Sequence, residues 1–387
     1  MTGEINCKTP QERDQQERRS SVDKLTYFKP SEYISSPLKE AEPPNRPKTN
    51  MAQRSPVADV IEFEPLEDPP WRGNLGKDTG EQPEEQPREY PTVKQMIVDI
   101  VSFQKRSTTK EDGEEVLRKI REKMIHKYIY QVNAEEEHGV GTLEKTIECI
   151  KAEEELKTSQ LEEEERAPLT EEEQETTNVY RAYKWLEDKV EKECEQDKSL
   201  YGLIESSIVK ELHKIIMDKL PLQQGQTKPG NCSEQIRYTT FNGEYYRYQR
   251  PNDMEEELNK VLDRFNSLID WSKSISDSEE KILKVFQAAS WFLFEFLDLH
   301  PFSDGNGRLC RLLCSYAMSV CSPFPTPIYN IWSESSKKYY INALVDTRNS
   351  SDRHPKALTT MIIECSWYGW KEYLKELEKI QKGIKNI

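Results

Sequence analysis

One apolar segment in the last third of the chain constrains the fold most. Residues 288–299 are apolar on nearly every side of a helix, and such a helix belongs inside a core. The segment is short and interrupted by acidic residues, so it cannot span a bilayer. Pro301 disfavours helical dihedral angles at the residue before it, which predicts that the helix ends near His300. The sequence therefore predicts a central helix that leads directly into His300.

Helical spacing of apolar residues recurs on both sides of this segment, which predicts a mainly α fold. Asp277 and Glu280 have the spacing of a capping box that opens the central helix. The acidic run at 153–175 interrupts the apolar pattern, and we interpret it as a solvated helix face and linker. The ranges expected to be helical are 91–103, 113–132, 142 to the acidic run, 178–194, 203–220, 251–268, 277–299 and 309–317.

A different pattern lies between two of these helices. β-prone residues at 237–241 and 244–248 flank Asn242 and Gly243. Both central residues of a type I′ turn need positive φ, which Asn and Gly adopt most readily. These residues therefore predict a β-hairpin.

The N-terminal part of the chain has the composition of a disordered tail. Residues 1–90 are rich in Pro, Glu, Gln, Arg and Ser and show no sustained apolar period. Residues 57–63 and Trp71 are short apolar islands that could dock on a core. After the tail we expect a helical region at 91–200, a main folded domain at 201–375 and the end of a C-terminal helix at 376–387.

Charge and cysteine usage exclude some classes of partner. The formal net charge is -15, and no large basic block provides the patch that sequence-independent nucleic-acid binding needs. We expect no nucleic-acid partner and, without an apolar span or a secretory signal, no membrane partner. The eight cysteines lack paired spacing, which favours the cytoplasm or the nucleus. The oligomeric state stays open, and a homodimer is one state that we allow for.

The residues after the central helix carry the chemistry. From 300 to 311 the chain reads His-Pro-Phe-Ser-Asp-Gly-Asn-Gly-Arg-Leu-Cys-Arg, and a further helix follows. Gly305, Asn306 and Gly307 at a helix N-terminus leave backbone N–H groups accessible, which forms a cradle for phosphate oxygens. Arg308 and Arg311 are three residues apart, so both can bracket a polyphosphate.

Two more residues complete this predicted site. Asp304 precedes the cradle, where a carboxylate can bind Mg²⁺ that bridges two phosphates. His300 lies at the end of a rigid helix and can accept a proton from an incoming hydroxyl. Each feature alone is common in proteins, but in this order they predict a polyphosphate site.

The stretch also resembles the signature of the Fic family, HPFx(D/E)GNGRxxR, at every specified position. The resemblance extends roughly from Tyr128 to Tyr373. It implies a mostly helical Fic domain with a small β-hairpin flap ahead of the signature, and residues 237–248 fall where that flap belongs. It also implies a protein adenylyltransferase, which transfers AMP from ATP to a Ser, Thr or Tyr hydroxyl of a target protein by in-line attack at the α-phosphorus, with pyrophosphate leaving.

The resemblance implies roles for individual residues. His300 would be the general base, and Asp304 would bind Mg²⁺. The residues from Gly305 to Arg308, Asn306 and Gly307 included, would hold the α- and β-phosphates, and Arg311 would reach the γ-phosphate. The flap residues Thr239, Thr240, Phe241 and Asn242 would cover the nucleotide and pair with an extended segment of the target. Tyr339 and Tyr340 occupy the place of family tyrosines near the adenine, although adjacent tyrosines in a helix also commonly serve packing.

Many members of this family carry an inhibitory motif, [ST]xxxE[GN], whose Glu pairs with the second arginine of the signature. The resemblance implies this role for Glu137, although Asn133 and His138 depart from the motif at both flanking positions. Glu148 and Glu205 are alternative candidates. Residues 135–137 can also be read simply as solvated acids.

Other functions stay open on the sequence alone. The same site could remove AMP or use another donor, such as UTP. A non-catalytic Fic-fold interaction protein would share the fold, although the intact signature argues against it.

Overall fold

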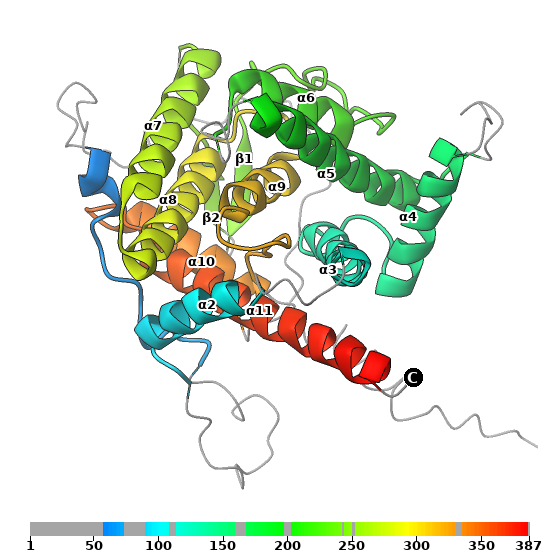
Figure 1. Ribbon diagram of the computed structural model, residues 1–387. Helices are drawn as coiled ribbons and strands as arrows, with labels where there is room; N and C mark the ends of the chain where they lie inside the picture. Colours follow the sequence, from blue (N-terminus) through cyan, green and yellow to red (C-terminus); the bar gives the residue numbers. More distant parts are fainter. Residues whose placement is uncertain are drawn as a thin grey trace, which may run out of the picture. The chain divides into compact units, whose positions relative to one another are not determined.

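The computed structural model describes residues 57–72, 90–107, 114–158, 168–196, 203–241, 244–249, 252–329 and 335–385 (Figure 1). It is mainly α with one small antiparallel sheet, as the sequence predicts. The helices form one body within residues 50–235 and 249–387, and residues 236–248 belong to a second unit. Among the described helices, none combines the length and the apolar content that crossing a membrane requires. The predictions for residues 1–56 and 73–89 of the tail lie outside the described residues.

The predicted central helix is α8, Ser278–Leu299. Its N-cap is Asp277, whose carboxylate accepts hydrogen bonds from the N–H groups of Glu279 and Glu280 at 3.0 and 2.8 Å. This confirms the predicted start of the helix. The helix ends where Pro301 predicts, because His300 adopts a left-handed conformation with φ 53°. Most of its side chains are buried, so α8 forms the centre of the helical body.

Other helices enclose α8 from several directions (Figure 1). α7 (Met254–Ser274) and α9 (Asn306–Met318) pack against it directly, as do α2 (Val93–Ser107) and α11 (Lys356–Lys385), which also pack against each other. α3 (Glu114–Ala134) and α6 (Ser206–Ile216) contact α9. α4 (Leu143–Thr158) and α5 (Glu171–Gln196) pack against α3 and so complete this side of the body.

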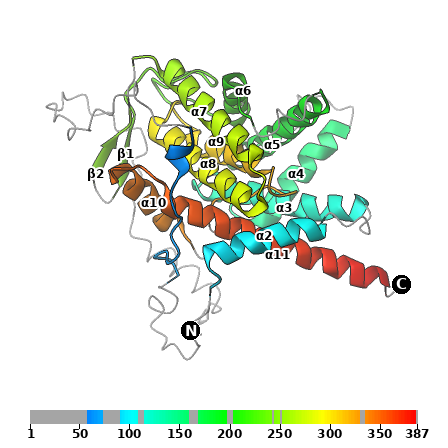
Figure 2. The same ribbon diagram turned by 60° about the vertical axis from the view of Figure 1, so that its left-hand side comes forward.

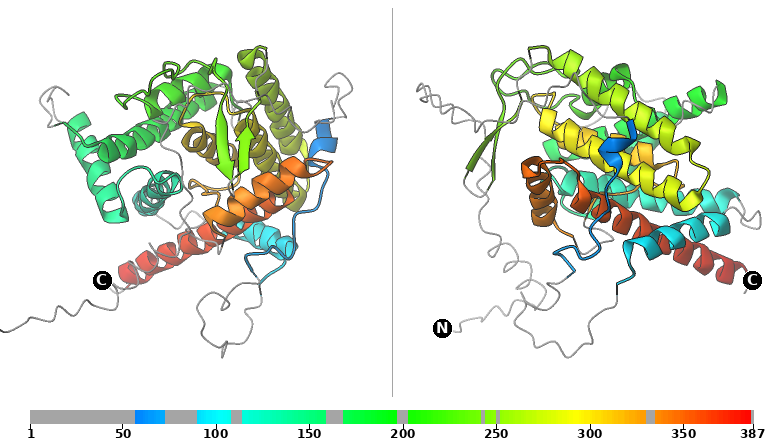
Figure 3. Two further views of the ribbon diagram at one scale, coloured as in Figure 1. Left: turned by 180° about the vertical axis from the view of Figure 1, so that it is seen from behind. Right: turned by 90° about the vertical axis from the view of Figure 1, so that its left-hand side faces the viewer.

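The helical body does not divide at the boundaries expected from the sequence. α11 runs through residues 375 and 376 without a break. α5 and α6 lie on the two sides of residue 200 in the chain and pack against each other. α10 (Lys337–Asn349) packs against both α11 and α8 (Figure 3). The helices on both sides of residues 200 and 375 therefore share one core, and residues 376–385 are the end of a C-terminal helix, as expected.

The acidic run is not a solvated linker at either of its ends. Glu153 in α4 is 3% exposed and binds Arg181 through two hydrogen bonds of 2.7 and 2.9 Å. α5 begins at Glu171 rather than near 178, and Glu175 in its second turn is also buried. These carboxylates are buried because cationic side chains or backbone N–H groups compensate them. The middle of the run, residues 159–167, lies outside the described residues.

Residues 57–72, the N-terminal strap, pack on the helical body. η1 (Val57–Ile61) contacts α7 and α8 (Figure 2). Trp71 is 2% exposed, and its indole N–H donates to Glu364 of α11 at 2.7 Å. Arg72 pairs with the other oxygen of the same carboxylate at 2.6 Å. The prediction of a disordered tail is therefore wrong for this segment, and the alternative that its apolar islands dock on a core is confirmed.

Residues 236–248 contain the predicted hairpin. β1 (Tyr238–Phe241) pairs antiparallel with β2 (Glu244–Arg247), and the register sets Phe241 opposite Glu244. The strands of a hairpin are thus found where the Asn-Gly pair predicts it, with Asn242 and Gly243 between them and outside the described residues.

Candidate active site

The loop at residues 300–305 connects α8 to α9 and carries the start of the signature. Asn306 fixes this loop, because its Oδ1 accepts the Phe302 N–H at 2.9 Å and its Nδ2 donates to the Phe302 carbonyl at 2.8 Å. Gly305 is the N-cap of α9 with φ 71°, and a Cβ there would lie 2.9 Å from the sulfur of Met217. Only glycine fits that position without strain. The Asn306 side chain therefore fixes the loop. The backbone N–H of Asn306 is not used in these contacts and can bind an anion.

The N-terminus of α9 forms the predicted cradle. The first helical hydrogen bond runs from the Leu309 N–H to the Gly305 carbonyl at 3.0 Å. The N–H groups of the three residues between them have no partner inside the helix. A Cβ on Gly307 would lie 2.1 Å from Oε1 of Glu136, so a carboxylate oxygen lies beside Gly307. An anionic side chain is therefore already present next to the predicted cradle.

Arg311 is surrounded by two carboxylates from the end of α3. Its side chain is 2% exposed, and its Nη2 donates to Glu136 at 2.6 Å, while its Nε lies 2.8 Å from Glu135. Burial alone would raise the pKa of Glu136, but the Arg311 charge and hydrogen bond outweigh it and lower that pKa to about 2. Burial raises the pKa of Glu135 to about 8, although Arg311 opposes the change. Glu136 is thus the ionised partner of Arg311, and its side chain is still 36% exposed.

Arg308 is equally buried, with 1% of the residue exposed. Its Nη1 lies 3.6 Å from Glu175 of α5, and its Nη2 lies 3.7 Å from the sulfur of Met217. Glu175 also accepts the Gly139 N–H at 2.7 Å and pairs with His138 at 2.5 Å. The carboxylate that compensates Arg308 therefore also anchors the turn that follows Glu136.

Glu137 does not pair with Arg311, so the predicted contact is wrong. Glu137 adopts φ 62°, and its exposed carboxylate pairs with Lys337 at 3.1 Å. The buried face of α3 explains why residues 135 and 136, and not Glu137, lie beside Arg311. The buried residues Tyr128, Ile129 and Val132 continue at helical spacing to residues 135 and 136. That spacing in the sequence could have identified Glu135 and Glu136. The alternative candidates Glu148 and Glu205 are both exposed.

His300 and Asp304 lie at the two ends of the loop. The left-handed backbone of His300 turns the chain out of α8, and the Pro301 carbonyl accepts the Ser233 N–H at 2.8 Å. Oδ1 of Asp304 accepts the Gly305 N–H at 2.6 Å. Asp304 also accepts a hydrogen bond on its carbonyl from His213 of α6 at 3.0 Å. No short motif identifies His213, Met217 or Glu175 as part of this site, because they lie on α6, at its C-cap and on α5.

Tyr339 and Tyr340 both pack within the body. Tyr340 is 5% exposed and stacks on Tyr329 with ring centroids 4.7 Å apart. Tyr339 is partly buried, and its ring lies 5.9 Å from that of Trp71 in the strap. Their proximity to an adenine stays a prediction. The same holds for the covering role of Thr239, Thr240, Phe241 and Asn242, of which the first three lie on β1.

These residues fit a polyphosphate with a magnesium ion. Two buried guanidinium groups and a helix N-terminus supply donors for phosphate oxygens. Asp304 supplies a carboxylate oxygen, a ligand that Mg²⁺ prefers. Within the ranges that the structure describes, no three His, Cys, Asp or Glu side chains gather as a complete metal site. A magnesium ion would therefore take its other ligands from phosphates and water, as it usually does.

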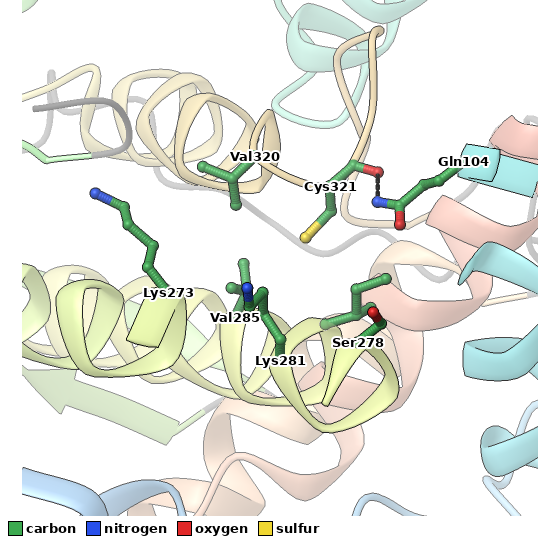
Figure 4. A pocket seen from close by; sticks show the side chains of 8 residues that line it. Gln104, Lys273, Ser278, Lys281, Val285, Val320 and Cys321 are labelled. Atoms are coloured by element: carbon green, nitrogen blue, oxygen red, sulfur yellow. Dashed lines mark hydrogen bonds between the residues drawn. The ribbon is translucent and has the colours of Figure 1, made fainter. Parts of the chain in front are cut away.

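A separate hollow of about 240 Å³ lies between the C-terminal end of α9 and the start of α8 (Figure 4). Gln104 donates to the Cys321 carbonyl at 2.7 Å on one side of it. Its lining includes Lys273, Lys281, Val285 and Val320. None of the predicted site residues lines this hollow, so it is distinct from the signature site.

Comparison with known proteins agrees with this geometry. Residues 203–318 match the model of the Fic/DOC family. A Fido domain-containing protein of Dictyostelium discoideum is 28% identical over 134 residues, which make up 34% of this chain and 84% of that protein. Residues 203–318 are therefore similar to a Fic/DOC domain.

Solved structures of this kind share the fold. Fic-1 of C. elegans is similar with a TM-score of 0.53 and 18% identity, over 74% of this chain and 73% of that chain. A Fic family protein of Desulfovibrio desulfuricans is similar with a TM-score of 0.51 and 17% identity, over 75% and 77% of the two chains. The similarity thus covers helices well beyond residues 203–318.

Proposed function

We propose that the chain is a protein adenylyltransferase, which transfers AMP from ATP to a Ser, Thr or Tyr hydroxyl of a target protein. The observation that carries this proposal is the pair of buried arginines at the N-terminus of α9, with an anionic oxygen lying over Gly307 between them. Buried guanidinium groups need anions, and two of them beside free backbone N–H groups suit a polyphosphate. Fic domains generally transfer a nucleoside monophosphate to proteins, which supports the choice of reaction.

The residues of the site would divide the work between binding and proton transfer. The Arg308 guanidinium would bind the α- and β-phosphates together with the backbone N–H groups of Gly307 and Arg308. Arg311 would bind the γ-phosphate. His300 would accept the proton of the target hydroxyl as its oxygen attacks the α-phosphorus, and pyrophosphate would leave. Asn306 keeps the loop that carries His300 in one conformation, so the base is oriented before the target arrives.

Asp304 would hold the metal ion in this scheme. Mg²⁺ bound there would neutralise charge on the phosphates and on the departing pyrophosphate. The Asp304 carboxylate is partly exposed and is oriented by the Gly305 N–H, so it can reach a ligand at the cradle. One carboxylate per magnesium is common where phosphates supply the other ligands.

Glu136 would act as a brake on this reaction. Its carboxylate occupies Nη2 of Arg311 and the space over Gly307, which are the groups that the β- and γ-phosphates need. ATP and Glu136 would then compete for the same donors, because a guanidinium edge binds one anion bidentately. The exposed third of the Glu136 side chain leaves room for the carboxylate to swing away.

Labelled ATP tests the proposal. The full chain is incubated with a protein lysate and Mg²⁺, once with ATP labelled at the α-phosphate and once with the γ-phosphate labelled. The proposal predicts protein labelling from the α-position and none from the γ-position. Labelling from the γ-position alone would identify a kinase-like enzyme, and stronger labelling from α-labelled UTP would identify a different donor.

A further inference from the structure

A buried histidine from α6 lies beneath the signature loop. His213 is 3% exposed, and its ring stacks on Phe302 with centroids 3.9 Å apart and planes 11° apart. Phe302 is 0% exposed and is the residue that Asn306 fixes. His213 therefore touches the loop from the core side.

Both ring nitrogens of His213 have backbone partners. The Gly230 N–H donates to Nδ1 at 2.8 Å, and Nε2 lies 3.0 Å from the carbonyl of Asp304. A nitrogen that accepts an N–H bond carries no proton, so the proton of the neutral ring is on Nε2. Nε2 therefore donates to Asp304, and the two contacts fix the tautomer.

This hydrogen bond acts on one rigid peptide plane. The Asp304 carbonyl and the Gly305 N–H belong to the same peptide group, which is planar. His213 binds the oxygen at one edge of this plane, and the N–H at the other edge donates to Oδ1 of Asp304 at 2.6 Å. Rotation of the plane would break both hydrogen bonds, so the position of the oxygen determines the orientation of the carboxylate.

The segment between α6 and β1 restrains the same loop from a second side. The Thr227 N–H donates to the Ser303 hydroxyl at 3.1 Å, and the Ser233 N–H donates to the Pro301 carbonyl at 2.8 Å. Gly230, which binds Nδ1 of His213, lies between these two residues. His213 is thus the point at which α6, this segment and the signature loop meet.

We propose that His213 is a positioning residue that orients the Asp304 carboxylate toward its magnesium ion. The inference rests on the proposed function, in which Asp304 is the magnesium ligand. His213 contacts neither nucleotide nor metal in this role and acts through the Asp304–Gly305 peptide plane. Loss of the Nε2 hydrogen bond should weaken the magnesium-dependent part of ATP binding while the arginine contacts remain.

Two substitutions separate the two hydrogen bonds. In His213→Asn, the amide oxygen replaces Nδ1 and keeps the Gly230 contact but loses the donor to Asp304. In His213→Gln, the amide nitrogen replaces Nε2 and keeps that donor. Both lose the aromatic stack on Phe302, so their effects on folding should be similar. His126→Asn is the matched control, because His126 is a buried histidine of α3 whose charged neighbours are Glu122, Lys151 and Glu154.

Isothermal titration calorimetry of the full chain measures the dissociation constant of ATP with and without Mg²⁺, and thermal melting measures stability. For His213→Asn we expect the gain in ATP affinity from Mg²⁺ to fall by roughly 3- to 10-fold, the range for one lost hydrogen bond. His213→Gln should retain most of the gain in ATP affinity from Mg²⁺. His126→Asn should retain the full gain despite a lower melting temperature.

Three results would overturn the inference. Equal magnesium dependence in His213→Asn and the wild type would show that the hydrogen bond does not orient Asp304. Equal losses in His213→Asn and His213→Gln would assign His213 to packing alone. A wild-type chain that binds ATP without any magnesium dependence would instead refute the proposed function, and this inference with it.

Discussion

Replacement of Glu136 by glutamine tests how the resting site competes with ATP. Glu136→Gln keeps the size of the side chain and removes its charge. The hydrogen bond from Arg311 Nη2 at 2.6 Å then changes from an ion pair to a neutral contact. Glu135 stays 2.8 Å from Arg311 Nε, so the buried guanidinium keeps one carboxyl group beside it and the variant should fold.

The expected gain follows from the contact that ATP no longer has to displace. A hydrogen bond to a charged group contributes about 1.5–3 kcal/mol, which corresponds to roughly 10- to 100-fold in a binding constant. The dissociation constant of ATP should therefore fall by about this factor in Glu136→Gln. The rate of α-label transfer at low ATP concentration should rise in parallel, since more of the ATP binds with its γ-phosphate on Arg311.

Calorimetry with ATP and Mg²⁺, together with initial rates of label transfer, measures both quantities. Glu137→Gln is the matched control, because Glu137 is the next residue of the same turn and its carboxylate pairs only with Lys337 among the residues described. Adding Arg311→Ala to Glu136→Gln should erase the gain, since the brake and the phosphate share this residue. An ATP affinity within twofold of the wild type in Glu136→Gln would refute the competition between carboxylate and phosphate.

Three other substitutions test separate parts of the structure. His300→Ala should lower transfer by roughly 10²- to 10⁴-fold while calorimetry finds an unchanged ATP affinity, and a parallel loss of affinity would assign His300 to binding instead. Burial raises the pKa of Glu135 from an ordinary 4.5 to about 8, so between these values the folded state keeps a proton that the unfolded chain releases. The free energy of unfolding of the wild type should then fall as pH rises, by up to about 1.4 kcal/mol per pH unit. Urea unfolding at pH 5.5 and 7.5 should show a smaller change with pH in Glu135→Gln, and an equal change in the two proteins contradicts this. Trp71→Ala should cost about 3–5 kcal/mol in the free energy of unfolding, and a loss under about 1 kcal/mol would mean that the strap adds little to the body.

The central helix and the signature loop could be predicted because local rules decide them. Asp277 caps the start of α8, and Pro301 limits its end, whatever the rest of the chain does. The hairpin follows in the same way from a two-residue Asn-Gly loop. The sequence left docking of the strap open, because the helices that its apolar islands pack on, α7, α8 and α11, lie far along the chain.

The acidic turn shows where two sequence signals conflict. The spacing of the inhibitory motif points to Glu137, but the helical period of the buried residues on α3 points to Glu135 and Glu136. The helical period predicts the correct residues because it identifies the side of α3 that faces α9. On that side the Tyr128 hydroxyl donates to the Arg311 carbonyl at 2.9 Å. A motif that has lost both flanking residues no longer fixes its register, so the packing of the helix decides.

The resting partners of both signature arginines come from outside the segment that matches the family. Arg308 and Arg311 lie within residues 203–318, whereas Glu175 comes from α5 and Glu135 and Glu136 lie at the end of α3. An arginine that is 1–2% exposed is costly without an anion, so Glu136 compensates Arg311 and Glu175 compensates Arg308 while no nucleotide is bound. Under the proposed function, ATP would have to exchange at least one of them for phosphate. A change in how α3 packs on α9 should therefore alter the affinity for ATP without touching any signature residue.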